Sequence, residues 1–410
     1  MDYAITSRIL GNDLNLIVQD DFLSWVDWEP GGYVVGPAGS DQVSIDDLAE
    51  MHMIDSRPEI VHSEHRRAFK ALLGGEEHSV PWGLALRPDY LMKRVRATME
   101  WAQNVLCVHE ASGYGETYRI GQELLSSLYR ATVDVKRLQL HLSSEVNPGL
   151  RSQLHSFVAH GSEPVPGGDR IRPPRTVYSR CSTSTGRLTV VEGPNVLTLP
   201  KRYKDIFGAA RDHTLVEVDF VSLEPRVALY VAGRKETPRD IYSDVSDRLS
   251  SSLGNHLDRD TAKLATLSSL YGSGPSELQK QLGSRSAARE VLRVTKEYFC
   301  VDQLRNRLRQ DLHDKNLRNH FGRPLHSLDG QEDSHKLVNH FIQSTAVDVA
   351  LLGFSSLLNF VKHLKPRPIY VIHDALLLEI PNAHLDEFVR ICSRGVDIEM
   401  GCFRLGVKER

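Results

Sequence analysis

Residues 370–380, YVIHDALLLEI, have the composition of a buried strand, but His373 and Asp374 stand side by side in the middle of the apolar run. An ionised carboxylate that enters a protein core without a partner is strongly destabilising. We therefore predict that Asp374 either has a partner or performs a chemical task.

A second apolar stretch also carries an aspartate. Residues 214–223, TLVEVDFVSL, predict a strand that contains Asp219. Either aspartate alone is explained as a turn former or a satisfied core acid. Two together fit a magnesium site, because Mg²⁺ prefers carboxylate oxygens and usually takes one or two of them with substrate phosphates. Such a pair on adjacent strands could bind two ions and stabilise an in-line displacement at phosphorus.

Residues 258–274, DRDTAKLATLSSLYGSG, predict a helix with Asp258 as its N-cap and Gly272 just beyond its end. Four side chains recur every four residues and form one slightly drifting stripe: Arg259, Lys263, Leu267 and Tyr271. The two cations could bind a triphosphate, and the tyrosine could stack on a base. An amphipathic helix with a solvated basic edge explains the same pattern, so this segment alone does not decide.

Composition bounds the class of protein. The chain has 410 residues, enough for two or three domains, with 40% hydrophobic and 25% charged residues. No uninterrupted apolar run reaches the roughly 18 residues of a membrane span, and the first residues lack a signal-peptide pattern. Five cysteines without C-x-x-C spacing argue against a zinc site or a disulfide framework. We expect a cytoplasmic protein that does not contact a membrane.

The net charge of −3 conceals an asymmetry. Residues 1–60 contain twelve acidic residues and two arginines, whereas residues 169–211 contain nine basic residues and three acidic ones. A basic segment is commonly a solvated face, but one interrupted by Pro and Gly could also follow a phosphate backbone. Charge alone leaves both interpretations open.

The order of patterns along the chain predicts an α+β protein. We expect strands at 14–19, 32–36, 214–223 and 396–409, helices at 63–74, 121–146, 258–274 and 334–361, mostly helical sequence over 239–320, and a linker at 161–174.

Five segments together resemble the family A DNA polymerases. DFVSLEPRVALYVAG resembles motif A, RDTAKLATLSSLYGSG motif B and VIHDALLLEIP motif C. STGRLTVVEGPNVLTLP resembles the family's T-G-R-L-S block, and NHFIQSTAVDVALLGF its N-x-x-x-Q-G-T-A-A-D helix. The five blocks occur in the family's order over roughly residues 180–410, which is far more specific than any one of them.

The resemblance implies a right-hand polymerase fold of palm, fingers and thumb with a small N-terminal α/β domain. The expected boundaries are 1–112 for an accessory or degenerate exonuclease-like domain, 113–175 for thumb and linker, 176–238 for the first part of the palm, 239–325 for the fingers and 326–410 for the second part of the palm.

The resemblance also implies roles for single residues. Asp219 and Asp374 would bind two Mg²⁺ ions, with Mn²⁺ as a possible substitute, and Lys263 would protonate the pyrophosphate leaving group. The expected nucleotide-binding residues are Arg259, Lys263, Leu267, Tyr271, Glu224 and Tyr242, and Glu224 would exclude a ribose 2′-hydroxyl. The expected DNA-binding residues are Arg187, Asn339, Gln343 and His373.

Several positions depart from the family pattern. Ala375 stands where motif C usually has Glu, Leu267 replaces an aromatic residue, Tyr242 replaces a histidine and Ser344 replaces a glycine. Two aspartates still suffice for metal binding, so we expect a reduced rate in a divergent enzyme of phage or mobile-element type.

The resemblance therefore implies a monomeric, template-directed DNA polymerase that uses primer–template DNA and dNTPs and lacks proofreading. The N-terminal region offers only Asp27 and Glu29 as a strand-associated D-x-E, too few carboxylates for an exonuclease, and its acidity suits a replication protein partner. Two alternatives remain open: an RNA polymerase or primase-like activity on the same palm, and a nucleic-acid-binding protein with weakened chemistry.

Overall fold

The computed structural model describes residues 2–10, 14–19, 22–36, 38, 42–58, 86–159, 161–166, 168–234, 240–272, 274–325 and 334–410. The chain forms two compact units, residues 1–126 and residues 127–410. The helix predicted at 63–74 lies outside the described residues.

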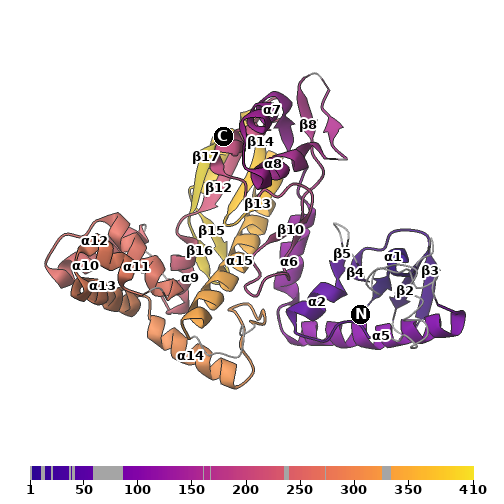
Figure 1. Cartoon of the computed structure of the whole chain (residues 1–410), viewed down its shortest axis with the longest axis horizontal. Coiled ribbons are helices and arrows are strands. Elements are labelled where there is room, and N and C mark those ends of the chain that lie inside the picture. Colours follow the sequence, from indigo (N-terminus) through magenta and orange to yellow (C-terminus); the bar gives the residue numbers. More distant parts are fainter. Residues whose placement is uncertain are drawn as a thin grey trace. The chain divides into compact units, whose positions relative to one another are not determined.

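The N-terminal unit contains a five-stranded mixed sheet in the order β3-β2-β1-β4-β5 (Figure 1). Its strands are β1 (Tyr3–Ile5), β2 (Asn15–Gln19), β3 (Phe22–Val26), β4 (Gly32–Val35) and β5 (Gln42–Ser44). Strands β1, β2 and β3 pair antiparallel, whereas β4 pairs parallel to both β1 and β5. The strands predicted at 14–19 and 32–36 are confirmed.

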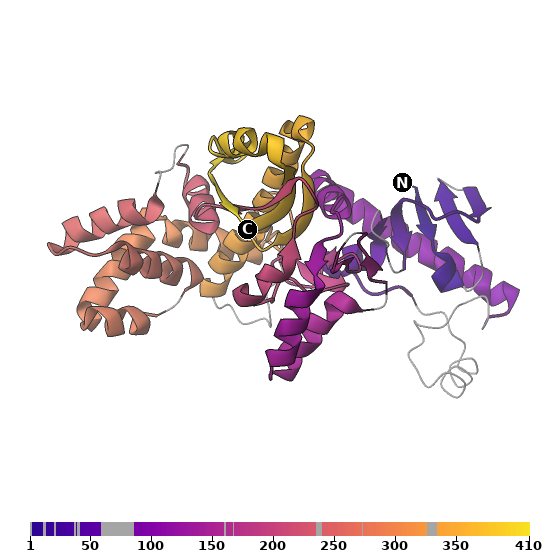
Figure 2. The same ribbon diagram turned by 90° about the horizontal axis from the view of Figure 1, so that it is seen from above.

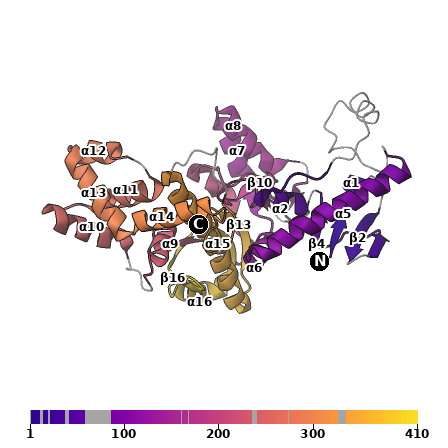
Figure 3. The ribbon, with the colours of Figure 1, turned by 90° about the horizontal axis from the view of Figure 1, so that it is seen from below.

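Burial explains which strands are central. All three residues of β1 are buried, and Leu16, Val34 and Val35 of the neighbouring strands are also buried, so these strands carry the core of the unit. The described helices of the unit are α1 (Ser7–Leu10), α2 (Ile45–Met51), α5 (Pro88–Ala111) and α6 (Gly115–Ser126). Figure 3 shows α5 as one long helix, and α2 packs against it.

The C-terminal unit is built around a four-stranded antiparallel sheet in the order β13-β14-β12-β17. Its strands are β12 (His213–Phe220), β13 (Arg367–Ile372), β14 (Ala375–Pro381) and β17 (Leu405–Glu409). The short β15 (Val396–Ile398) and β16 (Gly401–Phe403) pair with each other beside it. The strands predicted at 214–223 and 396–409 are confirmed.

Residues 370–380 are not one strand, and this prediction was wrong. The apolar residues on the two sides of His373 and Asp374 belong to β13 and β14, which pair with each other as a hairpin. The polar pair forms the turn, and the backbone of His373 is left-handed, with φ of 58°. A tight reversal and an interrupted strand share one apolar pattern, so periodicity could not separate them.

Helix α15 (Ser334–Phe360) is the core helix of the unit. Phe354 packs on Phe220 of β12 with ring centroids 4.9 Å apart, and a Cβ at Gly353 would lie 2.7 Å from the Phe220 ring. The segment Lys336–Phe360 is long and apolar enough to cross a membrane by length and composition, but 67% of its most apolar window is buried inside the protein. Burial of this kind is that of a core helix.

A group of helices occupies most of residues 223–313, as predicted for 239–320, and appears as the pink-to-orange lobe of Figures 1 and 2. Its members are α9 (Leu223–Val231), α10 (Ile241–Leu253), α11 (Arg259–Tyr271), α12 (Ser276–Leu282), α13 (Arg285–Tyr298) and α14 (Val301–His313). The Asp258 side chain accepts from the Thr261 N–H at 2.8 Å, so the predicted N-cap of α11 is present.

The single helix predicted over 121–146 is wrong. It is divided into α6, the strand β6 (Thr132–Asp134) and α7 (Val135–Ser144). The β-branched Thr132 and Val133 pair with β11 (Phe207–Gly208), and Val133 also pairs with β8 (Arg170–Arg172), because tertiary pairing overrides a helical apolar spacing. The stretch interpreted as a linker, 161–174, carries β8 and its partner β7 (Glu163–Pro164).

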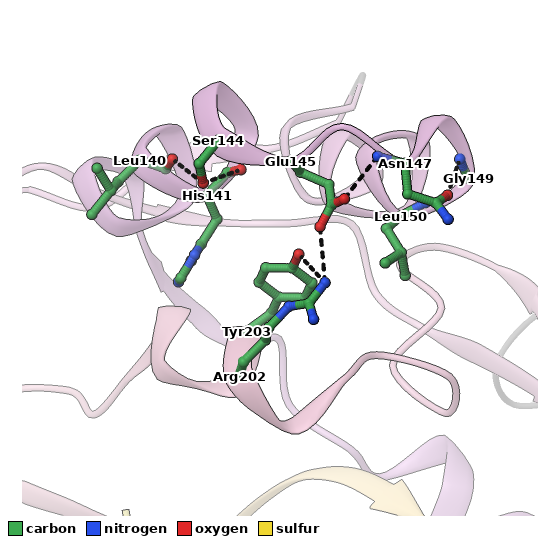
Figure 4. A network of polar contacts seen from close by, with 9 residues as sticks. All are labelled: Leu140, His141, Ser144, Glu145, Asn147, Gly149, Leu150, Arg202 and Tyr203. Atoms are coloured by element: carbon green, nitrogen blue, oxygen red, sulfur yellow. Dashed lines mark hydrogen bonds and ion pairs between the residues drawn. The ribbon is translucent and has the colours of Figure 1, made fainter.

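Hydrogen bonds and an ion pair connect the turn between α7 and α8 (Pro148–His155) to the 3₁₀ segment Lys201–Ile206 (Figure 4). Glu145 accepts from the Asn147 N–H at 2.8 Å and from Arg202 at 3.1 Å, and these bonds lower its pKa. Arg202 also donates to the Tyr203 hydroxyl at 2.8 Å. One of the nine basic residues counted in the segment 169–211 therefore serves the fold.

Candidate active site

The β12–β14 register brings the two aspartates together. Asp219 pairs with Ala375, the residue after Asp374, and the Phe220 N–H donates to the Asp374 carbonyl at 3.1 Å. Both aspartates line the same cleft, whose volume is about 690 Å³. Two carboxylates 155 positions apart in sequence thus meet at one end of the β13-β14-β12-β17 sheet.

Electrostatics at this pair favour cation binding. Partial burial and the negative charges of Asp374 and Glu217 raise the pKa of Asp219 to about 7, and Lys204 only partly offsets them. Burial also raises the pKa of Asp374. Among the described residues, no group of three or more His, Cys, Asp or Glu side chains is arranged as a metal site. A pair of hard oxygen donors nevertheless suits Mg²⁺, which needs one or two protein carboxylates.

Glu224 lies in the first turn of α9 and lines the same cleft. Its carboxylate accepts from the Tyr271 hydroxyl and lies 3.4 Å from Arg187, and its side chain is 18% exposed. The helix starts abruptly after Ser222, whose φ is 54°. Two partners from different elements therefore hold Glu224 in one orientation at the cleft wall.

Helix α11 presents three of its four predicted residues to the cleft: Lys263, Leu267 and Tyr271. Arg259 does not line it and instead binds Asp240 through contacts of 2.7 and 3.3 Å. A row of residues four apart drifts by about 40° at each step, so Arg259 lies about 120° around the helix from Tyr271. The four residues lie along one drifting stripe of α11, as predicted, but Arg259 at the N-terminal end of the stripe does not line the cleft.

Tyr242 lines the cleft and lies beside the N-terminal end of α11. The Arg259 guanidinium lies 5.1 Å from the Tyr242 ring centroid and the Lys263 ammonium 5.9 Å from it. Arg259 also lowers the pKa of Asp240 to about 2, so Asp240 stays ionised at any physiological pH. Asp240 was not among the predicted site residues, and the structure shows that it is the N-cap of α10.

Three of the four predicted DNA-binding residues line the cleft: Arg187, Gln343 and His373. The fourth, Asn339, lies one turn before Gln343 on α15, and its Oδ1 is buried without a hydrogen-bond partner among the described residues. His373 Nε2 lies 3.1 Å from the Leu197 carbonyl, which joins the hairpin turn to the segment 184–200.

A buried polar network supports the cleft and was not predicted. Asp348 is bound by Arg180 at 2.9 Å and by Asn319 at 2.6 Å, and all three side chains are buried. Arg323 donates to the Arg180 carbonyl at 2.9 Å and packs over Gly186, the neighbour of Arg187. Because Arg180 and Asp348 are 168 positions apart, no local pattern could have revealed their pairing.

Comparison with known proteins agrees with this geometry. The family model described as DNA polymerase family A matches residues 168–407. Thermostable DNA polymerase I from Thermus thermophilus is 24% identical over 250 residues, which cover 54% of this chain and 30% of that protein. The enzyme of the same name from Thermus filiformis is 24% identical over 257 residues, covering 55% of this chain and 30% of that protein. The match thus spans under a third of the length of these relatives.

A solved structure has a similar fold. The polymerase domain of Pol1 from M. smegmatis, in complex with DNA primer–template and dNTP, superposes with a TM-score of 0.64 at 16% identity. The superposition covers 90% of this chain and 81% of that domain. It supports the α+β polymerase fold that the sequence predicted. Because the family model covers more than half of the chain, the chain belongs to DNA polymerase family A.

Proposed function

We propose that this chain is a template-directed DNA polymerase that adds deoxynucleotides to a primer 3′ end by two-metal phosphoryl transfer and releases pyrophosphate. One observation carries the proposal: Asp219 and Asp374 share a cleft with Lys263, the cation that the triphosphate and its leaving group require. The M. smegmatis relative was solved with DNA primer–template and dNTP, which fits the same substrates.

Family A polymerases generally use divalent ions. Here Asp219 and Asp374 would hold two Mg²⁺, or Mn²⁺ in its place, because burial and the charges of Asp374 and Glu217 raise the pKa of Asp219 and Lys204 offsets those charges only in part. A bound divalent ion supplies Lewis-acid stabilisation of the charge that develops at phosphorus. Ala375 adds no third carboxylate beside them, so the two aspartates carry this task alone.

Side chains of the cleft supply the remaining chemistry. Lys263 binds the triphosphate and transfers its proton to the departing pyrophosphate oxygen. Arg259 reaches the triphosphate only after it exchanges its carboxylate partner, Asp240, for phosphate oxygens. In this proposal, binding of the nucleotide is coupled to movement of the Arg259 side chain away from Asp240.

Glu224 sets the choice of sugar in this proposal. Because Tyr271 and Arg187 fix its carboxylate, a ribose 2′-hydroxyl would meet a rigid wall rather than a movable side chain. Arg187, Asn339, Gln343 and His373 would contact the primer–template without reading base sequence, which suits an enzyme that copies any template.

The N-terminal unit would not proofread. Its central β1 carries no acidic residue, and Asp27 and Glu29 follow the edge strand β3. We infer a degenerate exonuclease-like or accessory unit whose acidic character suits a protein partner, in a polymerase that acts as a monomer.

A second candidate is a nucleic-acid-binding protein with weakened chemistry. Ala375 beside Asp219 and Leu267 in the cleft favour it, because both remove groups that the family uses. An RNA polymerase activity is disfavoured by Glu224.

Primer extension separates these candidates. Asp219→Ala and Asp374→Ala should abolish extension by dNTPs while primer–template binding stays nearly unchanged, and Asp386→Ala on the exposed face of α16 (Leu385–Cys392) is the matched control. Equal extension by parent and aspartate variants would refute the polymerase proposal. Parallel reactions with rNTPs, and with RNA templates, test the RNA polymerase alternative.

A further inference from the structure

The end of the β13-β14-β12-β17 sheet remote from the aspartates carries a second cavity, of about 800 Å³. Its walls come from the end of α15, the segment 362–368, the start of β12 and the end of β14. Asp219 and His213 lie six residues apart on β12, so about 20 Å of strand separates the two sites. This cavity therefore lies outside the candidate active site.

The cavity is cationic. Lys362, Lys365 and Arg367 line it together with His213 and His384, and no acidic residue lines it among the described residues. Neither lysine forms an ion pair with any described carboxylate, whereas Arg367 lies 3.5 Å from Glu379. Two uncompensated ammonium groups on one wall attract polyanions.

The position of one lysine is locally unfavourable. Lys365 has φ of 54°, a left-handed conformation that glycine adopts much more easily. Lys362 lies two residues beyond the end of α15, where the helix dipole favours a cation, so this charge alone has an ordinary explanation. The dipole does not explain a second lysine in a strained backbone at the same cavity. A left-handed residue commonly closes a helix end, as Lys315 does after α14, so the backbone places this second charge at the cavity and the charge pattern carries the argument.

An aromatic side chain completes the cavity. Tyr129 is 51% exposed, and its N–H donates to the Pro368 carbonyl at 2.7 Å, which fixes it against β13. The Arg367 guanidinium lies 5.5 Å from the centroid of its ring. Beyond Tyr129 the surface becomes mixed in charge, because Arg130 pairs with Glu163 at 2.6 Å.

We propose that this cationic groove, defined by Tyr129, Lys362, Lys365 and Arg367, binds single-stranded nucleic acid. Positive side chains that contact the backbone, combined with an exposed aromatic ring on which a base stacks, are the features shared by proteins that bind single strands without sequence preference. The groove is distinct from the cleft that would hold the primer end, so the inference does not rest on the polymerase reaction.

The test is binding of a fluorescent oligothymidylate of about ten nucleotides to the full chain, measured by anisotropy over a range of salt concentrations. Lys362→Glu combined with Lys365→Glu should weaken binding at low salt at least about tenfold and reduce the salt slope by about 1.4. The matched control combines Lys93→Glu with Lys315→Glu, two exposed lysines outside the groove that form no ion pair with a described carboxylate, and Lys315 shares the left-handed backbone. This control should change affinity less than about twofold.

Folding and location are checked separately. The groove variant should retain its melting temperature and its extension of a short primer–template, so a failure of polymerase activity in the parent would leave this test intact. If the double variant does not fold, Tyr129→Leu and Lys365→Ser replace it and should each weaken binding. An oligonucleotide that contains 4-thiothymidine should photocrosslink to the peptide containing Tyr129.

Three results would overturn the inference. The first is unchanged binding by the groove variants, and the second is an equal loss in the control pair. The third is competition by inorganic polyphosphate or anionic vesicles as effective as competition by the oligonucleotide, which would mark a general anion site.

Discussion

Two aspartates in the C-terminal unit differ in how the protein balances their negative charge. Asp348 is 1% exposed and is satisfied inside the protein by Arg180 and Asn319. Asp219 forms no ion pair with any described cation, its neighbours Asp374 and Glu217 are acidic, and Lys204 offsets their charges only in part. A charge that the protein balances by itself supports the fold, whereas a charge left unbalanced at a cleft awaits a ligand. The difference separates structural from functional acids without reference to sequence similarity.

The largest expected effect lies at the unbalanced site. Asp374→Ala should reduce the rate of nucleotide addition by about 10⁴-fold, or ~5.5 kcal/mol of activation free energy, because half of the metal-binding carboxylates would be lost. Single-turnover primer extension measures the loss. A thermal melt in the absence of metal should show no decrease in stability, and a marked destabilisation would place Asp374 with Asp348 instead.

The balanced site should respond in the reverse way. Asp348→Ala leaves the Arg180 guanidinium buried without its carboxylate, so unfolding in urea should show a loss of about 3–5 kcal/mol. The surviving folded fraction should still extend a primer after correction for its concentration. Asp386→Ala serves as the exposed control and should change stability by less than about 0.5 kcal/mol. An unchanged midpoint for Asp348→Ala would remove the distinction between the two sites.

Glu224 is intermediate, because its carboxylate has two partners yet faces the cleft. Glu224→Ala should raise the incorporation of rNTPs relative to dNTPs by about 30-fold, or ~2 kcal/mol, since the wall against the 2′-hydroxyl is removed. Competition between labelled dNTP and rNTP on one template measures the ratio. Tyr271→Phe removes the hydroxyl that orients Glu224 and should give a smaller change in the same direction. A ratio that stays constant in both variants would exclude Glu224 from sugar selection.

The smallest effect concerns pH. The pKa of Asp219 is about 7 in the folded state against 3.8 ordinarily, so the folded state binds more protons between these values and loses stability as pH rises through them. Asp219→Asn removes this dependence. In EDTA the variant should be more stable than the parent by about 1 kcal/mol at pH 8, a value reduced because solvent reaches the part of the Asp219 side chain that is not buried, and equally stable near pH 4. Chemical unfolding at both pH values checks the sign, and a larger difference at pH 4 would contradict it.

Local sequence patterns predicted most of the candidate site but not its supports. Asp219 was singled out as a carboxylate inside an apolar strand, and Lys263 and Tyr271 by their four-residue spacing on one helix, and all three line the cleft. Asp374 shares a cleft with Asp219, as predicted, but it was assigned to the wrong element, because a hairpin whose two strands are both apolar has the same pattern as one strand. Arg259 was placed on the correct stripe, but helical drift and the unassigned Asp240 turn it away. The Arg180–Asp348 pair escaped detection because its partners come from distant segments.

Because α15 packs closely against β12, a substitution at one buried position of α15 would alter the geometry of the cleft. Gly353 leaves no space for a methyl group against the Phe220 ring, and Phe220 directly follows Asp219. Alanine at this position would have to displace the ring, and the displacement would reach the carboxylate through a single peptide bond. A substitution at Gly353 is therefore a route to a temperature-sensitive form of this protein. Such a variant would be active at low temperature and inactive at high temperature without a substitution at any residue that lines the cleft.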